Sequence, residues 1–135
     1  MKNSIKLTLL GGALACAGVA HSEVVVIVNP KHAAASMTAE QVANVYLGKD
    51  LALAPVDLPE ANGARSEFYK KVAGKDAAQV KAIWARLIFT GQGQPPKEVS
   101  NSADAVKQVA GSDKGIAYVE KAAVDSSVRV VLSVN

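Results

Sequence analysis

Residues 23–29 read EVVVIVN, a nearly unbroken run of β-branched side chains. Such a run leaves no polar side chain to face water at alternate positions, which is typical of a strand covered on both faces in an α/β sheet. Pro30 follows directly and ends the strand pattern. We therefore expect an α/β fold in which helices cover this strand.

Four helices are predicted from capping residues and from glycines that stop a helix. The first and third begin with capping boxes, which pair Thr38 with Gln41 and Asp76 with Gln79. The second follows the turn at Asn62. The predicted helices cover residues 39–47, 64–73, 77–89 and 102–110.

The longest predicted helix, the third, has the clearest apolar periodicity. Its apolar residues follow the i, i+3, i+4, i+7, i+8 pattern of one helix face, so we expect this helix to anchor the core. These residues are Val80, Ile83, Trp84, Leu87 and Ile88. The stretch that follows, TGQGQPPKEV at 90–99, is predicted to be a loop, either an ordinary connection or a recognition surface.

Three more strands complete the expected sheet. They are the short APVDLP stretch at 54–59, GIAYV at 115–119 and VRVVLSV at 128–134, and one helical turn is expected between the last two. The order β-α-β-α-α-α-β-β predicts a mixed sheet covered by about four helices. One domain, residues 23–135, accounts for the whole of this pattern.

Residues 1–22 have the pattern of a secretory signal peptide, which predicts a periplasmic protein. Lys2 and Lys6 form a basic start, an apolar run covers residues 7–19, and small residues stand at Ala20 and Ser22. The run is shorter than the ~20 residues of a membrane-spanning helix, so no membrane span is expected after cleavage.

Cleavage after Ser22 is the first choice and cleavage after Ala20 the second, with lipidation at Cys16 as a third option. Cleavage after Ser22 leaves 13 of the 15 basic residues and all 12 acidic ones, a net charge of +1. No basic run remains that would indicate nucleic acid as a partner. The only cysteine is also removed, so no disulfide is expected.

The turn EANGAR, residues 60–65, is the candidate binding site. A glycine at a helix start lets backbone N–H groups approach a ligand, and the helix N-terminus carries partial positive charge, so the turn can seat an anion. The simpler alternative is that Asn62 only caps the helix and Gly63 only relieves a tight turn.

Five stretches of the chain resemble one family in order and spacing, the phosphate-type substrate-binding proteins of ABC transporters. They are VVVIVNP (24–30), MTAEQVANVYLGKD (37–50), PVDLPEANGARSEFYKKVAG (55–74), WARLIFTGQGQPPKEV (84–99) and GIAYVEKAAV (115–124). The resemblance implies the type II periplasmic-binding-protein fold. Family members are normally two-lobed, and this chain resembles a single lobe.

In that family the turn commonly reads Ser-Gly-Thr and holds phosphate. The matching residues here are Asn62, Gly63 and Ala64, and Arg65 follows them as an arginine does in many relatives. The resemblance therefore implies an anion site at these four residues, with one hydroxyl replaced by an amide and another missing. No arginine stands at the strand end near Asp57, where phosphate binders often place one.

Two functions fit the sequence. The first is an exported protein that binds phosphate or a similar oxyanion, weakly unless a homodimer or a partner supplies the opposite wall. The second is an interaction or adaptor protein that keeps the scaffold without the ligand, with a transporter or porin component of the envelope as its partner. His32 alone makes a poor metal site, no serine has a histidine at motif spacing, and neither an enzyme nor a cofactor is predicted.

Overall fold

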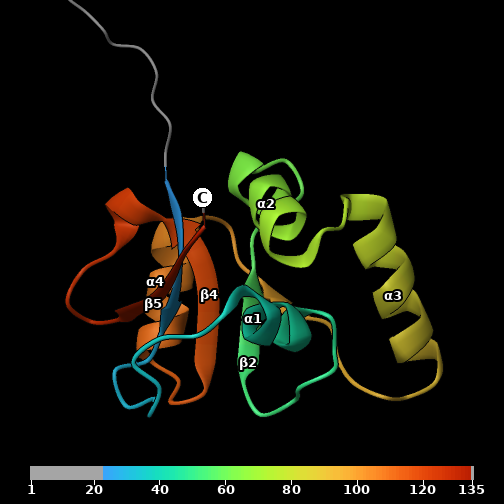
Figure 1. Ribbon diagram of the computed structural model, residues 1–135, viewed down its shortest axis with the longest axis horizontal. Coiled ribbons are helices and arrows are strands. Elements are labelled where there is room, and N and C mark those ends of the chain that lie inside the picture. The colour runs from blue at the N-terminus through green and yellow to red at the C-terminus, as the bar shows by residue number, and fades with distance from the viewer. Residues whose placement is uncertain (1–22, 135) are drawn as a thin grey trace, which may run out of the picture.

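β1 (Val24–Val28) lies inside a five-stranded mixed sheet with all five of its side chains buried, as the β-branched run predicts. The computed structural model describes residues 23–134 (Figure 1). The predicted leader, its cleavage sites and Cys16 lie outside these residues. The other strands are β2 (Ala54–Asp57), β3 (Lys97–Glu98), β4 (Gly115–Glu120) and β5 (Arg129–Val134), in the order β3-β2-β4-β1-β5.

The strand directions bring the ends of several strands to the same edge of the sheet. β2 runs parallel to β4, with Val56 opposite Ala117, whereas β1 runs antiparallel to both β4 and β5. The carboxyl ends of β2 and β4 therefore lie at the same edge as the start of β1. Asp57, the last residue of β2, is placed at this edge beside Tyr118 of β4.

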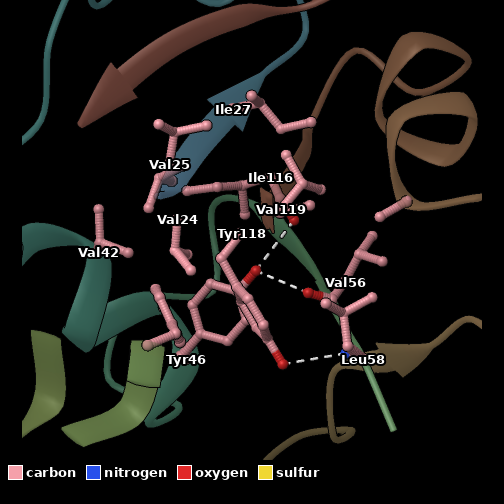
Figure 2. Packing of buried hydrophobic residues seen from close by; sticks show 14 of the residues in the cluster. Val24, Val25, Ile27, Val42, Tyr46, Val56, Leu58, Ile116, Tyr118 and Val119 are labelled. Atoms are coloured by element: carbon pink, nitrogen blue, oxygen red, sulfur yellow. Dashed lines mark hydrogen bonds between the residues drawn. The ribbon is translucent and has the colours of Figure 1, made fainter. Parts of the chain in front are cut away.

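Helices cover both faces of the sheet, which confirms the predicted α/β class. α4 (Ser102–Ala110) packs on β4, β1 and β2, while α1 (Ala39–Tyr46) and α2 (Gly63–Phe68) contact the sheet from the other side (Figure 1). Figure 2 shows the core between α1 and the strands, where Tyr46 donates a hydrogen bond to the Val56 carbonyl oxygen at 2.7 Å. Among residues 23–134, no helix has the length and apolar character needed to cross a bilayer.

Capping residues and helix-ending glycines predicted the positions of most helices correctly. Both predicted capping boxes are formed, at Thr38 with Gln41 and at Asp76 with Gln79. α4 covers residues 102–110 as predicted, and a 3-10 turn at Lys121–Ala123 lies between β4 and β5.

Two elements differ from the prediction. The second helix is not one α-helix, because α2 continues as a π-helical turn, η1 (Tyr69–Ala73), before Gly74 ends it in a left-handed conformation. The wider turn lets two successive side chains, Phe68 and Tyr69, both enter the core. The predicted loop at 90–99 contains β3, an edge strand that pairs with β2 over only two residues.

The expectation that the third helix anchors the core is wrong in large part. In α3 (Ala77–Phe89) only Val80 and Trp84 are buried, whereas Ile83 and Leu87 are half-buried and Ile88 is 52% exposed. α3 stands beside the sheet rather than on it (Figure 1). Its apolar stripe contacts α1 along one edge, where the Trp84 indole N–H donates to the Tyr46 carbonyl oxygen at 2.9 Å.

Candidate functional site

A buried carboxylate, Asp57, stands beside the predicted site. It is only 5% exposed, and two tyrosine hydroxyls donate to it: Tyr118 to Oδ1, and Tyr69 to Oδ2 at 2.8 Å. The Leu58 backbone N–H donates to the same Oδ1 at 3.1 Å. These donors offset the cost of burying a charge, which would otherwise be several kcal/mol.

The tyrosines belong to a cluster of four aromatic rings beneath the site. Phe68 stacks on Tyr118 with ring centroids 4.2 Å apart, and Tyr46 meets Phe68 edge-on at 4.8 Å. Burial raises the pKa of Tyr46, Tyr69 and Tyr118, and the nearby Asp57 charge raises each pKa further. The hydroxyls therefore stay protonated and remain donors across the physiological range.

Arg65 is turned toward this carboxylate. Its Nη1 donates to the Leu58 carbonyl oxygen at 2.8 Å, and its Nε lies 3.9 Å from Asp57 Oδ1. Glu98 of β3 lies 3.6 Å from Nη1, and the guanidinium carbon is 5.8 Å from the centre of the Tyr69 ring. Among the described residues, Nε has no hydrogen-bond partner although it is buried. The guanidinium is thus positioned by the protein and not fully satisfied by it.

The other three predicted site residues take different positions in the turn. Asn62 caps α2, because its Oδ1 accepts from the Ala64 N–H at 2.9 Å. The Ala64 side chain is buried, and Gly63 is exposed. A Cβ built on Gly63 would meet nothing within 4 Å, so the space above this backbone is open. The side chains of Asn62 and Ala64 thus serve the fold, and Gly63 leaves its backbone exposed. Of the four residues, Arg65 is the one that lines the neighbouring groove.

A groove of about 680 Å³ begins at Arg65 and runs along α3. Apolar side chains of α3 and the proline pair Pro95 and Pro96 line its length, and three carboxylates and two cations stand along its walls. The charged residues are Asp57, Glu60, Glu98, Arg65 and Lys81. Negative charge therefore surrounds the one guanidinium. Within residues 23–134 no three side chains of metal-ligand type are grouped.

Sequence reasoning missed the partners of Arg65. An aspartate that ends an apolar strand, as in APVDLP, signals a buried carboxylate that needs donors. Tyr118 in GIAYV could have been predicted to contact Asp57 if β2 and β4 had been predicted to be parallel neighbours. Glu98 had no such signal, because β3 is too short to read from sequence.

Three solved structures share the fold of this chain. A Clostridium perfringens protein, solved with bound phosphate and assigned as a phosphate ABC transporter substrate-binding protein, superposes with a TM-score of 0.65 and 20% identity over 81% of this chain and 44% of its own. An ABC-type phosphate transport receptor from Vibrio cholerae gives 0.62 and 15% identity over 81% and 45%, and PstS from Borrelia burgdorferi gives 0.61 and 11% over 82% and 46%.

The chain therefore spans less than half the length of these structures, and the likeness is one of fold. No protein-family model matches the chain, and no curated protein matches it in sequence. The resemblance in sequence to phosphate-type substrate-binding proteins agrees with the fold of these neighbours.

Proposed function

We propose that this is an exported protein that binds phosphate or a similar oxyanion on a scaffold like that of the phosphate substrate-binding proteins. The ligand would sit at the turn formed by Asn62, Gly63, Ala64 and Arg65, held by the Gly63 backbone N–H and by the guanidinium. The N–H groups of Asn62, Ala64 and Arg65 already donate to the Pro59 carbonyl oxygen and to the side-chain and backbone oxygens of Asn62. The observation that carries the proposal is the exposed, open backbone at Gly63, which begins α2 two residues before Arg65.

The surrounding charges imply weak binding. An oxyanion at the turn would compete with Asp57 and Glu98 for Arg65, and Glu60 would repel it. The backbone at Gly63 is also exposed to solvent, so one wall alone buries little of a small ligand. We expect a dissociation constant of about 1 mM, equivalent to only ~4 kcal/mol.

Calorimetric titration of phosphate into the purified protein tests the proposal. Gly63→Ala is the sharpest variant, because the added methyl has room in the fold and would stand beside the exposed Gly63 N–H, where the ligand is proposed to bind. We expect its affinity to fall about tenfold, since a charge-assisted hydrogen bond contributes ~1.5–3 kcal/mol.

Gly111→Ala is the matched control. It makes the same change at the end of α4, where a Cβ meets only an ordinary contact at 3.5 Å, and it should leave binding unchanged. Arg65→Lys keeps the positive charge but loses the planar fork, so it should also weaken binding. No heat with millimolar phosphate, or equal heats for Gly63→Ala and the unchanged protein, would refute the proposal.

A second function, an interaction or adaptor protein without a ligand, has one observation in its favour. Arg65 already contacts two carboxylates and a carbonyl oxygen, so its positive charge has partners within the protein when no anion is bound. This function predicts that the immobilised protein captures a specific envelope component and gives no heat with phosphate. Clear phosphate binding without any specific capture would exclude it.

A further inference from the structure

The sheet ends in an edge strand with an open outer side. β3 is last in the strand order and pairs with β2 in parallel register, Val56 opposite Lys97 and Asp57 opposite Glu98. The Val99 N–H donates to the Asp57 carbonyl oxygen at 2.9 Å, so residues 97 and 99 direct their backbone groups to β2. Successive residues of a strand direct these groups to opposite edges. The N–H and C=O of Glu98 therefore point away from β2, to the open edge.

The groove of about 680 Å³ lies between this edge strand and α3. α3 stands beside the sheet, so the groove runs along the sheet edge rather than over a face (Figure 1). Glu98 and the proline pair Pro95 and Pro96 line one side, and apolar side chains of α3, among them Val80 and Ile88, line the other. A groove between an edge strand and a helix is suited to an extended peptide, which can add to the sheet as a further strand.

The end of the groove at Arg65 is acidic. Glu60 and Glu98 are exposed there, and the buried Asp57 lines the same end. Arg65 lies 3.9 Å from Asp57 and 3.6 Å from Glu98, and it shares a smaller cavity with Glu60. Three carboxylates around one guanidinium leave this end negative, while Lys81 stands on the wall formed by α3. The groove therefore suits a partner that is apolar along its length and carries positive charge at this end.

We propose that the groove binds an extended peptide segment of a partner protein, in which apolar residues alternate with lysine or arginine. The segment lies beside β3 and exchanges backbone hydrogen bonds with Glu98. Because β3 is only two residues long, side-chain contacts supply the rest of the affinity. Basic side chains contact Glu60 and Glu98, and apolar ones pack against Ile88 and the proline pair. The site goes beyond the proposed anion site, since it uses the backbone of β3 and not that of the turn at 62–65.

Titration of the peptide acetyl-Val-Lys-Val-Lys-Val-amide into the full-length protein tests the proposal. Trp84 lines the groove and is the only tryptophan of the chain, so its fluorescence reports occupancy. We expect a saturable change at low ionic strength, where exposed charges interact most strongly. The matched peptide with glutamate in place of lysine keeps the apolar residues and should bind at least tenfold more weakly.

Alternate N-methylation of the basic peptide tests the strand pairing. In an extended peptide the valine N–H groups lie along one edge and the lysine N–H groups along the other. One of these edges faces β3, so methylation of that set removes the donors and methylation of the other set does not. We expect the two methylated peptides to differ at least tenfold in affinity. Equal affinities would contradict strand addition.

Two substitutions within the groove should act in opposite directions on the basic peptide. Glu60→Gln removes an exposed carboxylate and should weaken binding about threefold, the scale of one exposed ion pair. Lys81→Gln removes a cation from the opposite wall and should strengthen binding. Glu40→Gln, at an exposed position of α1 that does not line the groove, is the matched control and should leave binding unchanged. Far-UV circular dichroism checks that each variant is folded.

The proposal is overturned by the absence of a saturable signal, by equal binding of the basic and acidic peptides, or by the same effect of Glu60→Gln and Lys81→Gln. A fluorescence change that grows with protein concentration in the absence of peptide would place a second copy in the groove, and would also overturn it. Failure of phosphate binding would leave this result untouched.

Discussion

Asp57 is the residue on which the candidate site depends. It joins the sheet, the aromatic cluster and Arg65, because Tyr118, Tyr69 and the guanidinium all point toward its carboxylate. A buried carboxylate without these donors would be protonated or would destabilise the fold. The same contacts hold Arg65 at the mouth of the groove, so stability and any anion binding share one network.

The hydroxyl of Tyr118 should therefore matter more than that of Tyr46. Tyr118→Phe removes a donor to a buried charge and should lower the free energy of unfolding by ~1.5–3 kcal/mol. Tyr46→Phe removes a donor to a neutral carbonyl and should cost ~0.5–1.5 kcal/mol. Urea denaturation measures both, and equal losses would contradict the role assigned to Asp57.

The raised tyrosine pKa values predict a loss of stability in base. Unfolded tyrosines ionise near pH 10, whereas the higher pKa of the three buried tyrosines keeps them protonated in the fold. The folded state then binds more protons than the unfolded state, so stability is complete below about pH 10 and falls as the pH rises above it.

Absorbance at 295 nm follows tyrosine ionisation directly. Because the chain has only these three tyrosines, the whole signal should appear together with unfolding seen by circular dichroism. Tyrosinate that forms near pH 10 in a protein with intact circular dichroism would show that the hydroxyls are not held in the core.

At the scale of elements, local patterns predicted what depends on local contacts. The β-branched run gave β1, and the capping boxes gave the starts of α1 and α3. β3 and the π-helical turn η1 could not be predicted, because each exists through contacts with distant residues: β3 through β2, and η1 through the inward position of Tyr69.

α3 shows the limit of periodicity most clearly. The apolar periodicity correctly predicted a helix at 77–89. Periodicity indicates that one face of a helix is covered, but it does not identify the element that covers it. In the structure α1 covers one edge of the apolar face, through Trp84, whereas Ile83 and Leu87 are only half-buried and Ile88 is exposed. In the site, the capping role of Asn62 could be predicted from sequence, whereas the pairing of Arg65 with Glu98 could not.

The sparse packing of α3 predicts that it detaches before the sheet unfolds. Trp84 is the only tryptophan of the chain and is held by α1, so its fluorescence reports α3 alone. In urea we expect the fluorescence midpoint to lie below the circular-dichroism midpoint, because weakly packed elements open at lower cost. Coincident midpoints would contradict this.

Gly48→Ala provides the matched perturbation. Gly48 has φ +78°, and a Cβ there would lie 2.5 Å from Leu87 and 3.3 Å from Trp84, so the change should crowd α3 away from α1. Gly74→Ala has a similar φ of +66° with nothing within 4 Å. It should therefore share the backbone cost of ~1–2 kcal/mol without lowering the fluorescence midpoint selectively.

At the scale of the whole molecule, the chain combines a well-packed sheet with an open groove at one side. The sheet and its two helical layers share the fold of the solved structures, and a groove with charged walls lies between Arg65 and α3. We propose that the turn at 62–65 receives an oxyanion despite the carboxylates around it.

Amide resonances in a ¹⁵N-labelled protein test that claim most directly, since they detect even millimolar binding and locate it. On addition of phosphate at constant ionic strength, the account predicts saturable shifts centred on the amides of Gly63, Ala64 and Arg65, absent in Gly63→Ala and retained in Gly111→Ala. Shifts that do not saturate, or that centre elsewhere on the chain, would contradict it.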